Sequence, residues 1–341
     1  MTVHRKTKTI AIASAIVLLG ALIASALTLA GGRSGSGVSR DDQADGQRPQ
    51  PSATPPPSGP PRGELERRIA EFAAPFHADS GYREPSPTDR RAMAESVGLV
   101  LDGKREEAGR RLSRVGYQLR TLVDAETGRT YAELSDRSES VPAPRGWGRV
   151  YIDLSSPVRW SVQAPHPVSD ARTERLGARV LLGSPGGVLI IAGAHRDAGR
   201  GKSADVAHRR DTVFAAVCDE LAERGLPGIQ VHGFADDSAP DHDVIASTGT
   251  GTAGRADSKI LANALRGQGF QVCEAQARSC PLEGTENVEG HKAAAEDVPF
   301  LHVEFSNTVR TDEARTRRAV AAVDTLTARW AAGHRTTPPS P

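Results

Sequence analysis

The pattern of hydrophobic and polar positions divides the chain into three regions. Thr9–Gly32 is charge-free and largely apolar, whereas residues 33–62 have few apolar positions and are rich in Pro, Ser and Gly. From residue 63 onward, short apolar runs alternate with segments in which apolar residues recur every three or four positions. This alternation is typical of buried strands followed by amphipathic helices. The folded part is therefore expected to begin near residue 63.

Within the folded part, the sequence pattern predicts a small α+β elaboration over residues 63–148 and a larger α/β domain over residues 149–334. Strands that alternate with helices indicate helical layers on both faces of a sheet. We therefore predict an α/β three-layer sandwich with a mostly parallel mixed sheet, and a disordered tail over residues 335–341. The expected helices are Leu65–Ala74, Thr88–Leu101, Thr173–Leu182, His208–Arg224, Asp257–Arg266 and Asp312–Ala332. The expected strands are Tyr117–Val123, Arg129–Leu134, Val150–Leu154, Val158–Ala164, Gly187–Ala192, Gly228–Val231, Asp243–Ser247, Phe270–Cys273 and Pro299–Phe305.

The amino-terminal region predicts a membrane anchor. A basic segment, Met1–Lys8, precedes Thr9–Gly32, which is long enough to cross a bilayer as a helix. Basic residues before the span favour a cytoplasmic amino terminus. The alternative is a cleaved signal, because Ala24-Ser-Ala26 resembles a signal-peptidase site. Residues 33–62 would then be a flexible spacer. We expect a single-pass protein of the cell membrane with its folded part extracytoplasmic, or a secreted protein if the signal is cleaved.

Composition narrows the range of partners. The chain has 43 basic and 42 acidic residues and a net charge of +1. The overall charge therefore does not favour a nucleic acid as a binding partner. Aromatic residues make up only 4%, and Ala, Arg and Gly are abundant, as in proteins of GC-rich bacteria. Cys273 and Cys280 bracket a short polar loop and are expected to form a local disulfide in an oxidising compartment. Cys218 lies among apolar positions and is expected to be a buried thiol.

Three predicted strands end in residues that can bind a metal or carry a proton. His232 ends one strand, His166 follows another, and Glu304 closes a third. The carboxyl ends of parallel strands meet at one crevice. Asp170, four residues after His166, adds a carboxylate, so His166, Asp170 and His232 supply the three protein ligands of a catalytic zinc. Taken singly, His166 and Asp170 are also compatible with a loop residue and a helix cap.

Glu304 is the candidate general base. A carboxylate at the end of an apolar strand is costly unless its charge is compensated. In metal-assisted hydrolysis, such a Glu takes a proton from water and passes it to the leaving nitrogen. The alternative is a structural ion pair with an arginine such as Arg310. His302 alternates with Glu304 on the same strand and is expected to be a core histidine.

Further candidates follow other strands. Arg196 and Arg209 are candidates to bind a substrate carboxylate through two parallel hydrogen bonds, and Arg210 is a further one. His208 is a candidate substrate contact. His195 also ends a buried strand and is a rival metal ligand.

These residues together resemble the zinc carboxypeptidase and N-formylglutamate amidohydrolase-like superfamily, which includes poly-gamma-glutamate hydrolases. The resemblance covers about Trp160 to Arg310. It implies that Ile229–Phe234 carries a zinc-binding histidine, that Leu301–Phe305 carries the catalytic glutamate, and that Asp205–Arg209 reads the substrate carboxylate. The carboxypeptidase His-x-x-Glu motif is missing, and Ala194–Ala198 comes closest to it. His195 with Asp197 or Asp205 therefore stays open as an alternative to His166 and Asp170.

One motif competes with this interpretation. Gly249–Gly254 matches G-x-G-x-x-G between a predicted strand and a helix, with Glu274 about 20 residues later. Too little chain follows for a full dinucleotide-binding fold, so a loop bordering the crevice is favoured.

The sequence therefore predicts a membrane-tethered extracytoplasmic hydrolase that uses zinc, or another divalent transition metal. Its expected substrate is an amide bond of a peptide, a cell-wall peptide or an amino-acid derivative. A non-catalytic binding module with the same fold is the alternative.

Overall fold

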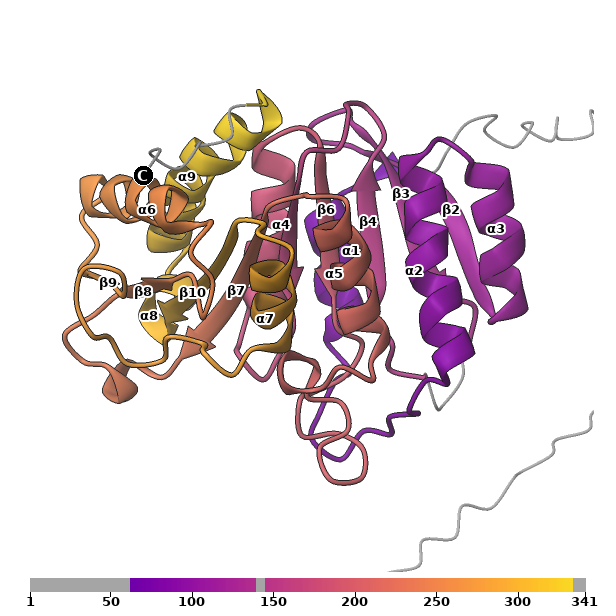
Figure 1. The fold of residues 1–341 in the computed structure, drawn as a ribbon, viewed down its shortest axis with the longest axis horizontal. Helices are drawn as coiled ribbons and strands as arrows, with labels where there is room; N and C mark the ends of the chain where they lie inside the picture. Colours follow the sequence, from indigo (N-terminus) through magenta and orange to yellow (C-terminus); the bar gives the residue numbers. More distant parts are fainter. Residues whose placement is uncertain (1–61, 139–144, 334–341) are drawn as a thin grey trace, which may run out of the picture. The chain divides into compact units, whose positions relative to one another are not determined.

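A ten-stranded mixed sheet runs through the computed structural model, which describes residues 62–138 and 145–333 (Figure 1). The strand order is β1-β2-β3-β4-β6-β5-β7-β10-β8-β9. Strands β6, β5, β7 and β10 form a parallel centre, and β4 and β8 border it in the opposite direction. The strands are β1 (Arg62–Gly63), β2 (Tyr117–Asp124), β3 (Thr130–Asp136), β4 (Arg149–Asp153), β5 (Trp160–Ala164), β6 (Gly187–Ile191), β7 (Gly228–Phe234), β8 (Val244–Ser247), β9 (Val272–Glu274) and β10 (Phe300–Ser306).

Helices cover both faces of this sheet (Figure 1). One apolar core joins the sheet to α1 (Leu65–Ala73), α4 (Thr173–Gly183), α6 (Arg255–Gly267) and α9 (Glu313–Ala331). A second core joins the other face to α2 (Pro87–Leu101), α3 (Arg105–Arg114) and α5 (Val213–Glu223), and α7 (Val288–Ala295) packs beside α5. The short elements are α8 (Asn307–Thr311) and the 3₁₀ turns η1 (Val206–His208) and η2 (Asp236–Ser238). The fold is a mixed α/β sandwich, as the alternating pattern predicts.

The largest departure from the expected elements is the predicted helix His208–Arg224. His208 instead ends the turn η1, and α5 begins only at Val213. Thr212 caps α5, because its hydroxyl accepts a hydrogen bond from the Ala215 amide at 3.0 Å. The helices α3 and α7 were not predicted. Each is short and buries few side chains, so neither shows a long apolar stripe.

The segment that precedes the predicted α/β domain belongs to the same sheet, since β1, β2 and β3 extend it beyond β4. This segment also reaches the loop that follows β6. The Tyr82 ring packs against Ala194, Ala198 and Ala204 of that loop. Nearby, the Trp147 indole donates a hydrogen bond to the Arg83 carbonyl. The amino-terminal segment therefore supports a loop that, as shown below, contributes to the site.

Among the residues that the structure describes, no helix is both long enough and apolar enough to cross a membrane. Three predicted segments lie outside the described residues. They are the anchor Thr9–Gly32, residues 33–61 of the spacer, and the tail 335–341.

Candidate metal centre and active site

The candidate residues meet at the carboxyl ends of the central strands. Glu304 on β10 is in register with His232 on β7, so their side chains lie on the same face of the sheet. His166 follows β5, and Arg196 follows β6. A pocket of about 440 Å³ opens at this edge. It is lined by His166, Arg196, Ala207, His208, His232, Leu282, Glu283, Gly284, Thr285, Glu286, Asn287, His302 and Glu304.

The structure brings the three predicted metal ligands together. One oxygen of Asp170, Oδ2, lies 3.3 Å from His166 Nδ1 and 3.4 Å from His232 Nδ1. All three residues are buried. The same Asp170 oxygen also accepts a hydrogen bond from the Gly233 amide at 3.2 Å, which holds the carboxylate against the end of β7.

The other nitrogen of each histidine is occupied by a hydrogen-bond acceptor. His166 Nε2 lies 2.8 Å from Asp205 Oδ1, and His232 Nε2 lies 2.6 Å from the side-chain oxygen of Gln230. Because these oxygens only accept, both Nε2 atoms carry the proton. Each Nδ1 is then left with a lone pair that faces Asp170. Metal-binding histidines are oriented in this way, with the second nitrogen donating to a carboxylate or carbonyl.

This geometry fits a zinc ion. Two atoms bound to one tetrahedral zinc at about 2.0–2.1 Å are themselves about 3.3–3.4 Å apart. The two distances from the Asp170 oxygen to the histidine nitrogens, 3.3 and 3.4 Å, match that separation. They are long for hydrogen bonds between a nitrogen and a carboxylate. The donor set of two imidazoles and one carboxylate is also one that catalytic zinc uses, with one position left open.

The electrostatics of the three groups agree with a site for a cation. Burial and the neighbouring His302 lower the pKa of His232 to about 4, so this imidazole is neutral at neutral pH. Burial raises the pKa of Asp170, but its hydrogen bonds with His166 and His232 outweigh burial and hold that pKa well below its usual range. Burial lowers the pKa of His166, but the hydrogen bonds to Asp170 and Asp205 dominate and raise it.

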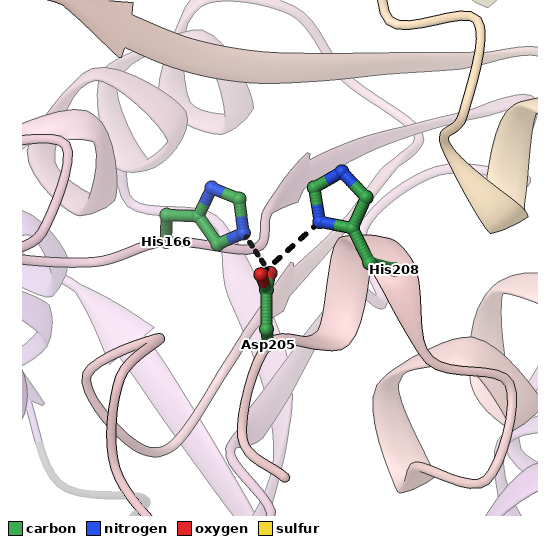
Figure 2. Close-up of side chains that lie close together, drawn as sticks. All are labelled: His166, Asp205 and His208. Atoms are coloured by element: carbon green, nitrogen blue, oxygen red, sulfur yellow. Dashed lines mark hydrogen bonds and ion pairs between the residues drawn. The ribbon is translucent and has the colours of Figure 1, made fainter. Parts of the chain in front are cut away.

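Two other groups also have metal-binding atoms within 4.8 Å of one another, namely His166, Asp205 and His208, and His232, His302 and Glu304. Figure 2 shows the Asp205 carboxylate between the rings of His166 and His208. These contacts of 2.8 and 3.1 Å have hydrogen-bond lengths, and Arg196 donates to the same carboxylate at 3.0 Å. Asp205 is therefore better suited to hold His166 in place than to bind an ion.

The group of His232, His302 and Glu304 lacks the support that a metal ligand needs. The Nδ1 atom of His302 is buried and has no hydrogen-bond partner among the described residues. In the described part of the chain, the group of His166, Asp170 and His232 is the one of the three in which the second nitrogen of every histidine has a hydrogen-bond acceptor.

Below the metal centre lies a buried layer of amides that sequence reasoning did not find. The Gln230 amide nitrogen donates to Gln163 and Glu289, while its oxygen accepts from Asn287 and His232. Burial raises the pKa of Glu289 to about 8, against the opposing hydrogen bond from Gln230, so its carboxyl is protonated at neutral pH. The four partners fix the orientation of Gln230, and Gln230 in turn fixes His232. The signal in the sequence was a glutamine two residues before His232, on the same face of the strand.

Glu304 is 9% exposed and lines the pocket. Its Oε1 atom lies 3.3 Å from His302 Nε2. The proposed ion pair with Arg310 is not what the structure shows, because the Arg310 guanidinium donates to the carbonyls of Phe305, Phe234 and Ala171. His302 was expected to be a core histidine, and it is buried. Its Nδ1 atom, however, has no hydrogen-bond partner among the described residues. Glu304 thus has a carboxylate that is free to act on a ligand in the pocket.

The remaining candidates separate into residues inside and outside the pocket. Arg196 and His208 line it, and both contact Asp205. Arg209 does not line it, because its guanidinium is paired with Asp211 at 2.5 Å. The nearest charged partner of His195 is Asp197, at 3.9 Å, and neither residue is in the metal centre. Cys273 and Cys280 are joined by a disulfide, and Cys218 is a buried free thiol.

The loop that presents His166 and Asp170 has an unusual backbone. Val168 and Arg172 both have left-handed conformations, with φ of 67° and 68°. For a β-branched residue such as Val168 this conformation is strained. Strain of this kind persists where the surrounding structure fixes it, often at functional sites. Here the Glu174 carboxylate accepts from the Val168 amide at 3.3 Å and holds the turn.

The glycine-rich segment Gly249–Gly254 has a structural explanation. It connects β8 to α6, and a side chain at Gly254 would lie 2.8 Å from the Phe300 carbonyl oxygen. A glycine is therefore needed for the close approach of α6 to β10. The segment does not line the pocket.

Comparisons with known proteins give structural similarity only. The sequence matches no protein family and no curated protein. The structure is similar to N-formylglutamate amidohydrolase from Ralstonia eutropha JMP134, with 14% identity, a TM-score of 0.37, and coverage of 54% of this chain and 96% of that one. It is also similar to the zinc-free form of YNDL, with 16% identity, a TM-score of 0.35, and coverage of 50% and 84%. A protein described as a metallopeptidase from Shewanella denitrificans OS217 has 14% identity, a TM-score of 0.36, and coverage of 77% and 99%.

At such identities and TM-scores, the function is argued from the residues of the site itself.

The support that Gln230 gives to His232 leads to a first prediction. Gln230→Met keeps the size of the side chain but leaves the His232 Nε2 proton without an acceptor, so zinc affinity should fall by about 10- to 100-fold. Gln118→Met is the matched control, since it removes a side-chain amide from β2 whose hydrogen bond is to Ser135 and not to the layer below His232. Competition with a chromophoric chelator measures both affinities in the full chain. Equal affinities in the two variants would contradict the role of Gln230.

Proposed function

We propose that this protein is a zinc-dependent hydrolase that cleaves an amide bond in a peptide, a cell-wall peptide or an amino-acid derivative. The observation that carries the proposal is the convergence of His166, Asp170 and His232 on one point, beside the Glu304 carboxylate, which lines the same pocket and is not paired with an arginine or lysine in the described part of the chain. A binding protein has no need for both features together.

The residues of the pocket divide the chemistry between them. Zinc held by His166, Asp170 and His232 would act as a Lewis acid that polarises the amide carbonyl and makes water a stronger nucleophile. Glu304 accepts a proton from the attacking water and passes it to the nitrogen that leaves. His302, 3.3 Å from Glu304, orients the carboxylate. His208 and Arg196 are placed to donate hydrogen bonds to the substrate.

We further propose that the protein works outside the cytoplasm, tethered to the membrane by Thr9–Gly32. The support is the apolar, charge-free character of that segment and its basic flank. The disulfide between Cys273 and Cys280 is consistent with an oxidising compartment. Cell-wall peptides would be accessible from this position.

The test combines metal content with amide hydrolysis by the full chain. Elemental analysis should find about one zinc ion per chain, as expected for a three-ligand catalytic site. The zinc-loaded protein should cleave members of a panel of peptides and N-acyl amino acids, and removal of zinc by a chelator should stop cleavage until zinc is restored. A protein that binds no zinc after reconstitution would overturn the proposal. Zinc binding with no cleavage of any amide would favour a binding module.

A further inference from the structure

One wall of the pocket is a loop that two separate anchors hold in place. This rim loop, Cys280–Asn287, contributes Leu282, Glu283, Gly284, Thr285, Glu286 and Asn287 to the lining. At one end, the disulfide ties Cys280 to Cys273 on β9. At the other end, Asn287 caps α7 and donates to Gln230 in the buried amide layer. The Glu283 carboxylate also accepts from the Cys280 amide at 2.7 Å. The loop therefore has a defined position over the metal centre.

Leu282, in the middle of the rim loop, combines two unfavourable features. It is 44% exposed, and no other large hydrophobic side chain in the described part of the chain is classed as exposed. Its backbone is also left-handed, with φ of 55°. For a residue other than glycine this conformation is unfavourable, because it brings Cβ too close to the following carbonyl oxygen. A single exposed leucine on a plain surface needs no explanation. At the wall of the pocket, the exposed Leu282 side chain offers an apolar surface to whatever occupies the pocket.

The charges of the pocket wall exclude another class of ligand. Glu283, Glu286 and Glu304 contribute carboxylates, whereas Arg196 is the one arginine or lysine among the residues that line the pocket in the described part of the chain. The Arg196 charge is offset by Asp205, 3.0 Å away. Glu286 is exposed and forms no ion pair with another described residue. Apart from the metal centre, Glu304 and Arg196, the charged groups of the pocket wall are the carboxylates of Glu283 and Glu286 on the rim loop, which repel a ligand group of the same sign.

We infer that the pocket recognises peptides with an apolar or cationic side chain beside the reacting amide, and that it rejects acidic peptides. Leu282 contacts the apolar side chain of such a peptide, and the Glu286 carboxylate attracts the positive charge of a cationic one. The inference rests on the proposed function for the position of the reacting amide. The inferred ligands differ from the glutamate-containing substrates that the names of some similar proteins suggest. A glutamate side chain would bring a negative charge close to the carboxylates of the rim loop.

Binding to an inactive full-length protein tests the inference without relying on turnover. The zinc-loaded Glu304→Gln full chain is titrated calorimetrically with short alanine peptides whose central pair of residues is leucine, lysine or glutamate, and with poly-γ-glutamate. The leucine and lysine peptides should bind at least about 10-fold more tightly than the glutamate peptide, a factor that corresponds to about 1.4 kcal/mol. Poly-γ-glutamate should bind no better than the glutamate peptide.

Variants in the same background assign the preference to the rim loop. Leu282→Ser should weaken binding of the leucine peptide by about 5- to 10-fold, the range for loss of one apolar contact, and leave the lysine peptide unchanged. Glu286→Gln should reduce the preference for lysine over glutamate. Glu106→Gln, at a side chain 96% exposed on α3, is the charge control and should change neither preference.

The outcomes separate this inference from the proposed function. Binding of the glutamate peptide or poly-γ-glutamate as tightly as the leucine peptide overturns the inference, as does failure of every peptide to bind. Unchanged preferences in Leu282→Ser and Glu286→Gln also overturn it. Selective binding without cleavage by the zinc-loaded wild type would leave the inference standing and refute hydrolysis.

Discussion

Glu304→Gln is expected to abolish amide hydrolysis while the protein keeps its zinc. Glutamine has the same shape as glutamate but accepts no proton, so the step that activates water loses its base. General-base catalysis typically contributes about 10²–10⁴-fold, and kcat should fall by a factor in that range. Because Glu304 is not among the three metal ligands, zinc content and thermal stability should stay close to those of the wild type. Steady-state kinetics and elemental analysis of the same preparation measure both effects.

The control for this experiment is Glu106→Gln, which removes a carboxylate from the surface of α3 far along the sheet from the site. Its kcat and zinc content should equal those of the wild type. If Glu304→Gln retained full activity, Glu304 would not be the base. If it lost zinc as well as activity, Glu304 would be a ligand, as in the group with His232 and His302.

His232→Ala should remove zinc from the protein. His232 contributes one of the three ligand atoms, and its replacement leaves Asp170 and His166 to bind the ion alone. Loss of a supporting residue costs about 10- to 100-fold in metal affinity, and loss of a ligand should cost at least about 100-fold. Chelator competition on the full chain measures the change. Circular dichroism checks that the variant remains folded.

Two further histidine variants distinguish the metal centre from its neighbours. His302→Ala and His208→Ala remove members of the two rival groups. If His166, Asp170 and His232 are the ligands, both variants keep their zinc. The exposed His77 provides the control for adventitious binding, because His77→Ala should change nothing. A loss of zinc in both His302→Ala and His232→Ala would assign the ion to the group with Glu304. A loss in His208→Ala with retention in His232→Ala would assign it to the group with Asp205.

The sequence predicted the parts of this site that depend on strand order and strand ends. Apolar runs located the central strands to within a few residues, and the rule that parallel strands meet at their carboxyl ends brought His166, His232 and Glu304 together. Asp170 followed from its spacing to His166. These features are local to each strand and its first turn, and one chain is enough to show them.

The rest of the site depends on contacts between distant segments. Asp205 lies 39 residues from His166, and Asn287 lies 57 residues from Gln230, so neither pairing leaves a periodic signal. Arg209 was expected in the pocket, but the turn before α5 directs it to Asp211 instead. The rim loop has no regular pattern at all. Its position follows from a disulfide and a helix cap, which fix it only once the sheet is formed.

The contact of Tyr82 with the loop after β6 bears on how the protein can be shortened or grafted. That loop carries Arg196 and leads to Asp205, whose carboxylate holds His166. A chain that began at β4 would retain every proposed ligand and the base, yet lose a support on which their alignment depends. The smallest transplantable unit is therefore longer than the part of the chain that contains the chemistry, and it must start upstream of Tyr82.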